Sequence, residues 1–68
     1  MDDDRLVIMA NQIAQFFASQ GAGAEAAVAD HIAKNWDPRM RAAILAHLAT
    51  GGEGLAPVAK AAVERLAA

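Results

Sequence analysis

The side chains that could perform catalysis are few. The only hydroxyl nucleophiles are Ser19 and Thr50, because the chain contains neither cysteine nor tyrosine. The two histidines, His31 and His47, are the residues best suited to act as a general base near neutral pH. Their spacing does not match a serine–histidine–aspartate arrangement, although residues distant in the sequence can still meet in a fold. The sequence therefore predicts no catalytic residue.

Metal and phosphate sites lack their usual patterns as well. The histidines form no His-x-x-x-His or Glu-x-x-His pair, and thiolate ligands are excluded by the absence of cysteine. The Gly51–Gly54 loop is expected to follow a helix and lacks the lysine and hydroxyl residue of a phosphate-binding loop. An acyl carrier needs a serine that opens a helix, whereas Ser19 is expected to close one. We predict that this chain binds no metal or cofactor, and we expect His47 to pack with one hydrogen bond.

The elements that would position these residues are helices. Alanine-rich segments with high helix propensity are separated by glycines and prolines, and no segment alternates as a strand does. Asp2 to Asp4 suit the start of the first helix, Gly21 its end, and Asp37-Pro38 the start of the third. The predicted helices run from about Asp4 to Gln20, Ala24 to Trp36, Pro38 to Thr50 and Pro57 to Leu66. The fold class is therefore all-α, a small bundle of about four short helices in a single domain over residues 1–68.

Apolar residues define the expected core of this bundle. In the first helix they are Leu6, Met9, Ala10, Ile13, Phe16 and Phe17. In the second they are Val28, Ala29, Ile32, Ala33 and Trp36. In the third they are Met40, Ala43, Ile44, His47 and Leu48, and in the last segment Leu55, Val58, Ala59, Ala62, Val63 and Leu66. Each set falls on one face at the helical repeat.

The core is small for a protein that must fold alone. Of the chain's 68 residues, 56% are hydrophobic, but half of these, nineteen, are alanine. A core of this size rarely supplies more than ~3–5 kcal/mol, and the common remedies are disulfides, a metal or association. Without cysteine, disulfides are excluded, so association with a partner is the expected remedy.

The net charge and the charge pattern along the chain indicate which kinds of partner are disfavoured. The net charge is −2 and the isoelectric point is about 5.4, which disfavours nucleic acid because its binding needs a concentrated basic face. The acidic start, Asp2 to Asp4, is the wrong charge for a signal peptide. The uncharged stretch from Leu6 to Ala24 is interrupted by polar residues and is amphipathic, so we predict no membrane span. We expect a cytoplasmic protein.

The first turn of the third helix carries charges of an unfavourable sign. Arg39 and Arg41 would face the positive end of the helix dipole, at a cost of roughly 0.3–1 kcal/mol each. One interpretation is that Asp37 neutralises one arginine and solvent covers the other. The alternative is that both arginines and Trp36 face an acidic patch on a partner, since tryptophan and arginine are enriched at binding hot spots. Trp36 also suits a core position.

Two helix surfaces that are expected to face solvent carry no charged residue. A helix that is apolar on both sides is usually buried on both sides, and so small a domain cannot cover them all. We interpret these surfaces as docking surfaces. They comprise Ile8, Asn11, Gln15 and Ser19 on the first helix and Ala42, Leu45, Ala46 and Ala49 on the third. The predicted partner-binding residues are Trp36, Arg39, Arg41 and Leu45.

Three segments resemble a known family. Leu6-Val7-Ile8-Met9-Ala10-Asn11-Gln12-Ile13-Ala14-Gln15-Phe16-Phe17 is similar to the first helix of formate dehydrogenase delta subunits. Val28-Ala29-Asp30-His31-Ile32, leading to Trp36-Asp37-Pro38-Arg39-Met40-Arg41, resembles their central signature. Gly51-Gly52-Glu53-Gly54-Leu55-Ala56-Pro57 resembles their C-terminal part. The tryptophan-to-arginine core is the most specific of these, and the resemblance covers nearly the whole chain.

The resemblance implies an accessory role. Delta subunits belong to soluble, cytoplasmic, NAD-dependent formate dehydrogenases that oxidise formate to carbon dioxide on a molybdenum or tungsten pterin. Electrons then pass through iron–sulfur clusters to a flavin and NAD. These cofactors would lie in the catalytic and electron-transfer subunits, because this chain lacks the cysteines that iron–sulfur clusters need. The chain would stabilise the catalytic subunit or assist insertion of its cofactor.

Two alternatives stay open at this point. The chain could be a stand-alone interaction module that forms a homodimer by burying its own alanine-rich faces. It could also be a helix-turn-helix DNA binder that reads bases with the third helix, which Arg39 and Arg41 fit loosely. The acidic total charge and the Asp37-Pro38 turn argue against DNA binding. Dimerisation of the isolated chain would favour the first alternative, and salt-sensitive retention on duplex DNA would favour the second.

Overall fold

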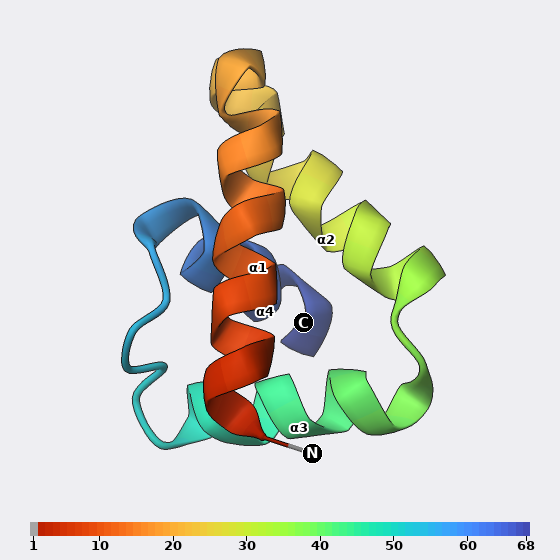
Figure 1. Cartoon of the computed structure of the whole chain (residues 1–68). Coiled ribbons are helices and arrows are strands. Elements are labelled where there is room, and N and C mark those ends of the chain that lie inside the picture. Colours follow the sequence, from red (N-terminus) through yellow and green to blue (C-terminus); the bar gives the residue numbers. More distant parts are fainter. Residues whose placement is uncertain (1) are drawn as a thin grey trace.

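The computed structural model describes residues 2–68, and within them the chain is helical without a strand. The elements are α1 (Asp3–Phe17), the 3-10 segment η1 (Ala18–Gly23), α2 (Ala24–Asn35), α3 (Pro38–Ala49) and α4 (Pro57–Ala67). The predicted all-α class is confirmed, while the number of helical elements differs because η1 adds to the four α-helices. In Figure 1, α1 lies in the middle, α2 beside it and α3 across its N-terminal end.

Helix starts follow the capping residues that the sequence predicted. The Asp2 carboxylate accepts a hydrogen bond from the Asp4 N–H at 3.0 Å, and the Asp37 carboxylate accepts one from the Met40 N–H at 2.9 Å. Pro38 and Pro57 occupy the first turns of α3 and α4. These capped starts fix where α1 and α3 begin, because each satisfies an N–H that has no partner inside the helix.

The end of α1 differs from the prediction. We expected the α-helix to continue to about Gln20, but it ends at Phe17 and the chain tightens into η1. Gly21 supplies the reversal with a φ of 58°, a conformation that residues with a Cβ rarely adopt. Gly21 therefore acts as the predicted stop, but one turn of 3-10 helix precedes it.

One core joins all four α-helices. Its fully buried side chains include Leu6 of α1, Ile32 of α2, Ile44 of α3 and Val63 of α4. Alanines fill the spaces between them, so the helices approach closely. The buried alanines of the core cluster are Ala10, Ala14, Ala29, Ala59 and Ala62. Helix packing of this kind is sensitive to volume, because small residues at the contact leave no room for larger ones.

The buried face of α1 is rotated from the predicted one. Leu6, Val7, Ala10 and Ala14 are the buried residues of this helix. Phe16, which we expected in the core, has 79% of its surface exposed. The stripe that faces the other helices is centred on Ala10 and Ala14, and Phe16 falls well to one side of it at ~100° per residue. The prediction placed the large side chains of α1 in the core, whereas the face that packs against the other helices is centred on alanines.

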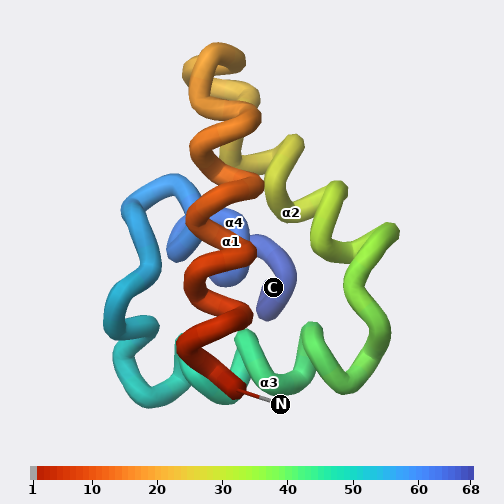
Figure 2. Tube along the Cα trace, in the orientation of Figure 1, coloured from red at the N-terminus to blue at the C-terminus, as the bar shows by residue number. Residues whose placement is uncertain are grey.

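The connection between α3 and α4 is held against α1 by one side chain. Figure 2 shows residues 50–56 running along one side of α1 before α4 begins. The Asn11 amide donates to the Gly54 carbonyl at 2.9 Å and its oxygen accepts from the Ala56 N–H at 2.8 Å. The sequence placed Asn11 on an uncharged docking surface opposite the apolar stripe of this helix, and in the structure its amide is engaged by the chain's own loop. The amide satisfies two backbone groups of a loop that forms no regular structure.

Candidate functional site

The histidines and hydroxyl residues do not form a catalytic group. His47 donates from Nε2 to the Glu53 carbonyl at 2.7 Å, and its Nδ1 lies 3.9 Å from an Asp3 carboxylate oxygen. The Thr50 hydroxyl donates to the backbone carbonyl of His47 at 2.9 Å and not to its ring. The packed histidine with one hydrogen bond is confirmed. Its contacts tie α3, the following loop and the start of α1 together.

Metal-binding side chains are not clustered in the part of the chain that the structure describes. Among residues 2–68, no group of three or more His, Asp or Glu residues is arranged to hold an ion. No helix there has both the length and the apolar character that crossing a membrane requires. A candidate functional site must therefore be sought in the shape and polarity of the surface.

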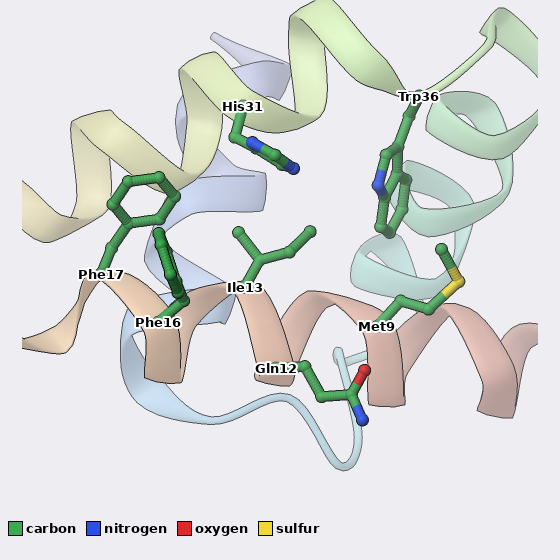
Figure 3. Close-up of a pocket in the computed structure, with 7 residues that line it drawn as sticks. All are labelled: Met9, Gln12, Ile13, Phe16, Phe17, His31 and Trp36. Atoms are coloured by element: carbon green, nitrogen blue, oxygen red, sulfur yellow. The ribbon is translucent and has the colours of Figure 1, made fainter.

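A largely apolar hollow lies between α1 and α2, and we call it the α1–α2 groove. It has a volume of about 450 Å³. Its lining residues are Met9, Gln12, Ile13, Phe16, Phe17, His31 and Trp36. Figure 3 shows the α1 side chains along one wall, with His31 and Trp36 reaching from α2 and the residue that follows it. No Asp, Glu, Lys or Arg lines the groove, so it suits an apolar ligand surface.

Phe16 is the most exposed large apolar residue at this groove. Its ring packs edge to face against Phe17, with the ring centres 5.1 Å apart and the planes at 89°. The centre of the Phe17 ring in turn lies 6.0 Å from the centre of the His31 ring. These contacts cover one edge of Phe16 and leave 79% of the residue exposed. An aromatic side chain held at the mouth of an apolar groove is typical of a protein-binding surface.

The far end of the groove is formed by Trp36 and Met9. Trp36 is 4% exposed and belongs to the core, so the core interpretation of this residue fits its position. Met9 also lines a second hollow with Asp2, Arg5 and Met40, between α1 and α3. The apolar surface therefore continues past Trp36 towards α3. Methionine adapts its shape to a partner more readily than branched side chains do.

Arg41 is engaged inside the molecule. Its guanidinium donates to the Trp36 carbonyl and, at 3.3 Å, to the Ala33 carbonyl, both at the C-terminal end of α2. Those carbonyls lack partners within their helix, and the negative end of the α2 dipole attracts a cation. The unfavourable interaction of Arg41 with the positive end of the α3 dipole is thus offset by its favourable interaction with the negative end of the α2 dipole. Neither interpretation of this arginine in the sequence included that contact.

The other predicted partner-binding residues are spread over the same corner and the α3 surface. Arg39 is exposed, whereas Leu45 is half-buried and packs against the core. The structure therefore brings Arg41 into contact with Trp36, because the Arg41 guanidinium donates a hydrogen bond to the Trp36 backbone carbonyl. It leaves Arg39 accessible to a partner. On the outer side of α3, Ala42, Ala46 and Ala49 are exposed, as predicted for that uncharged face.

Sequence reasoning missed the α1–α2 groove. Met9, Ile13 and Phe17 were assigned to the core, and they pack only partly buried against it. One signal was available, because Phe16 and Phe17 are adjacent and point ~100° apart on a helix, so one stripe cannot bury both equally. A second exposed apolar residue, Ile8, lies on another flank of α1 with 56% of its surface exposed.

Comparison with known protein families identifies a match over most of the chain. A family model described as the NADH-dependent formate dehydrogenase delta subunit, FdsD, matches residues 5–63. This range includes the α1–α2 groove and all four predicted partner-binding residues. No curated protein and no solved structure matches the chain.

Proposed function

The chain belongs to the family of NADH-dependent formate dehydrogenase delta subunits, and on this premise we propose that it is a non-catalytic accessory subunit of such a complex. It associates with the catalytic and electron-transfer subunits and stabilises the catalytic subunit or assists insertion of its cofactor. The molybdenum or tungsten pterin, iron–sulfur clusters, flavin and NAD belong to those partner subunits. The proposal keeps the cytoplasmic location predicted from the sequence.

The observation that carries this proposal is the α1–α2 groove. Exposed apolar surface around Phe16 costs free energy in water, and covering it with a partner recovers roughly 25 cal/mol per Å². The occupant in the complex is an apolar segment of a larger formate dehydrogenase subunit, laid against Met9, Ile13 and Phe16. Arg39 stands on the α2–α3 corner, where it is available to an acidic side chain of the same subunit.

The structure supports an accessory role better than DNA binding. A recognition helix needs its N-terminal side chains free to reach base edges. Arg41, one of the two candidate readers in α3, is bound to carbonyls of α2. The net charge of −2 adds repulsion from phosphate.

Co-purification tests the proposal directly. A tag placed after the exposed Ala68 is expected to retain the other formate dehydrogenase subunits from cells that make the complex, identified by mass spectrometry. An untagged strain provides the control. Retention of none of these subunits, with the tagged chain folded, would contradict the proposal.

Deletion of the chain separates its two suggested roles. If it stabilises the catalytic subunit, deletion lowers the amount of that subunit but leaves the metal content per polypeptide unchanged. If it assists cofactor insertion, the subunit accumulates with a low molybdenum or tungsten content. Normal amount, metal content and formate oxidation after deletion would exclude both roles.

A further inference from the structure

His31 is the residue of the α1–α2 groove whose charge can change near neutral pH. Its imidazole lines the groove together with six side chains that carry no ionisable group. Figure 3 shows the ring reaching from α2 into the space between the two helices. The residue is half-buried in the free chain, so a segment that fills the groove covers more of it. Docking in the groove and protonation of His31 are therefore linked.

The neighbouring Asn35 indicates which ring nitrogen of His31 carries the proton. The Asn35 amide nitrogen donates to the backbone carbonyl of His31 at 2.9 Å, which identifies this nitrogen as a donor. The same nitrogen lies 3.5 Å from Nδ1 of the His31 ring. Because Nδ1 faces a donor, it acts as the acceptor, and the neutral ring then carries its proton on Nε2. The neutral ring thus offers one N–H, at Nε2, to an occupant of the groove.

On its own helix, His31 has no counter-ion. Asp30 and Lys34, one residue before it and three residues after it, pair with each other at 3.1 Å, and both side chains are exposed. Glu25 belongs to the first turn of α2 and does not line the groove. Within the described residues 2–68, no carboxylate forms an ion pair with the His31 ring.

The elements around α2 place no compensating charge in the groove either, as far as residues 2–68 are concerned. Helix α1 and η1 have no charged residue between positions 6 and 24, and positions 2–5 do not line the groove. Arg41 of α3 is directed at carbonyls at the end of α2. The remaining ionisable residues also lie outside the groove lining; they are Asp37, Arg39, His47, Glu53, Lys60, Glu64 and Arg65. A protonated His31 beneath an apolar partner would therefore be a covered charge without a counter-ion, which is unfavourable.

We propose that docking of the larger subunit in the α1–α2 groove requires a neutral His31, so that proton uptake by this ring loosens the complex. This requirement rests on the proposed function, because it concerns the same groove and the same partner. It also defines the chemistry of the occupant over His31, an uncharged segment that offers a hydrogen-bond acceptor such as a backbone carbonyl to the Nε2–H. A carboxylate at that place would instead favour the protonated ring.

The direction of the pH dependence follows from this requirement. Docking removes the proton from an ionised His31, so proton uptake and docking compete. The affinity is therefore highest where the ring is neutral, and it falls as the pH drops through the titration of the ring, by at most about tenfold per unit of pH. Since histidine changes its charge between about pH 5 and 8, we expect the Kd at pH 5.5 to be roughly tenfold higher than at pH 8.

Calorimetric titration of the purified chain into formate dehydrogenase that lacks it tests this expectation. His31→Gln keeps a neutral donor that does not titrate, so its Kd should change by less than about twofold between the two pH values. The control His47→Gln removes the chain's other histidine, whose ring contacts Glu53 and Asp3 outside the groove, and should weaken at low pH as the parent chain does. Circular dichroism at each pH checks that the helices stay folded.

The protons exchanged on docking give a second measure that needs no acidic solution. At pH 6.5, the heat of binding in two buffers of different ionisation enthalpy gives the number of protons released for each chain that docks. The parent chain and His47→Gln should each release more protons than His31→Gln. Equal release by the parent chain and His31→Gln would overturn the requirement. A lower release by the parent chain would overturn it as well, and would identify a carboxylate over His31.

The requirement for a neutral His31 and the accessory role fail in different measurements. Binding of the parent chain that is equally tight at pH 8 and pH 5.5, with both proteins folded, would refute the requirement and leave the accessory role intact. The same weakening in the parent chain and in His31→Gln would assign the pH dependence to another group and also refute it. Absence of binding at pH 8, together with absence of co-purification, would refute the accessory role and the requirement that rests on it.

Discussion

Substitution of Asn11 tests quantitatively how its side chain holds the connection between α3 and α4 against α1. Its side-chain amide makes two hydrogen bonds to backbone groups more than forty residues away, at Gly54 and Ala56. In Asn11→Ala, both bonds are lost, and the Gly54 carbonyl and the half-buried Ala56 N–H lose their side-chain partner. We therefore expect the loop to loosen and the start of α4 to lose its anchor on α1.

The expected loss of unfolding free energy follows from the two hydrogen bonds. Each typically contributes about 0.5–1.5 kcal/mol, so their loss costs about 1–3 kcal/mol. Alanine has a better helix propensity than asparagine by up to ~0.7 kcal/mol. The net loss of unfolding free energy should thus be about 0.3–2.3 kcal/mol, out of the ~3–5 kcal/mol expected for so small a core. For a domain of this size, each kcal/mol lowers the Tm by about 4–8 °C.

Urea denaturation followed by circular dichroism measures this loss. Gln15→Ala is the matched control, because Gln15 is exposed on the same helix, and its unfolding free energy should change by no more than about 0.5 kcal/mol. Both variants are compared with the parent chain at one protein concentration. If Asn11→Ala were as stable as the Gln15→Ala control, the inference that this amide holds the connection would be refuted.

The remaining predictions concern α3 and its two ends. Arg41→Ala should lower the unfolding free energy by about 1.5–3 kcal/mol, because a charged group that caps α2 is lost; a neutral result in urea denaturation would show that the cap is not needed. Arg39→Glu should leave stability within about 0.5 kcal/mol but reduce co-purification with the formate dehydrogenase subunits; undiminished retention would remove Arg39 from the docking surface. Asp37→Ala should cost about 1 kcal/mol through loss of the N-cap of α3, measurable as a lower Tm. Gly52→Ala should cost about 1–3 kcal/mol, because Gly52 has a φ of 66° and a Cβ there would lie 3.3 Å from a Leu48 methyl; an unchanged Tm would contradict the strain.

Local signals in the sequence were sufficient to predict most of the helices. Asp2, Asp37, Pro38 and Pro57 fix helix starts through interactions within one turn, and the structure confirms each of these starts. Lys34 and Asp30, four residues apart on α2, form an ion pair at 3.1 Å. Such features depend on residues three or four positions apart, which a sequence shows directly.

Features that depend on distant residues could not be predicted in the same way. Asn11 was assigned to a docking surface because its partners, Gly54 and Ala56, are brought to it only by the packing of α4. Arg41 was assigned to Asp37, solvent or a partner because the C-terminal end of α2 reaches it only after the Asp37-Pro38 turn. The position of Phe16 depended on which face of α1 the small residues select, which composition alone does not decide.

The central claim is that the chain acts by docking its α1–α2 groove on a larger formate dehydrogenase subunit. Titration of the purified chain into formate dehydrogenase that lacks it, by calorimetry, tests this most directly. The account predicts saturable binding for the parent chain and for the control Ala26→Asp, an exposed position of α2 outside the groove, and loss of binding for Phe16→Asp while its helices stay folded. Equal binding by Phe16→Asp, or no binding by the parent chain, would contradict the claim.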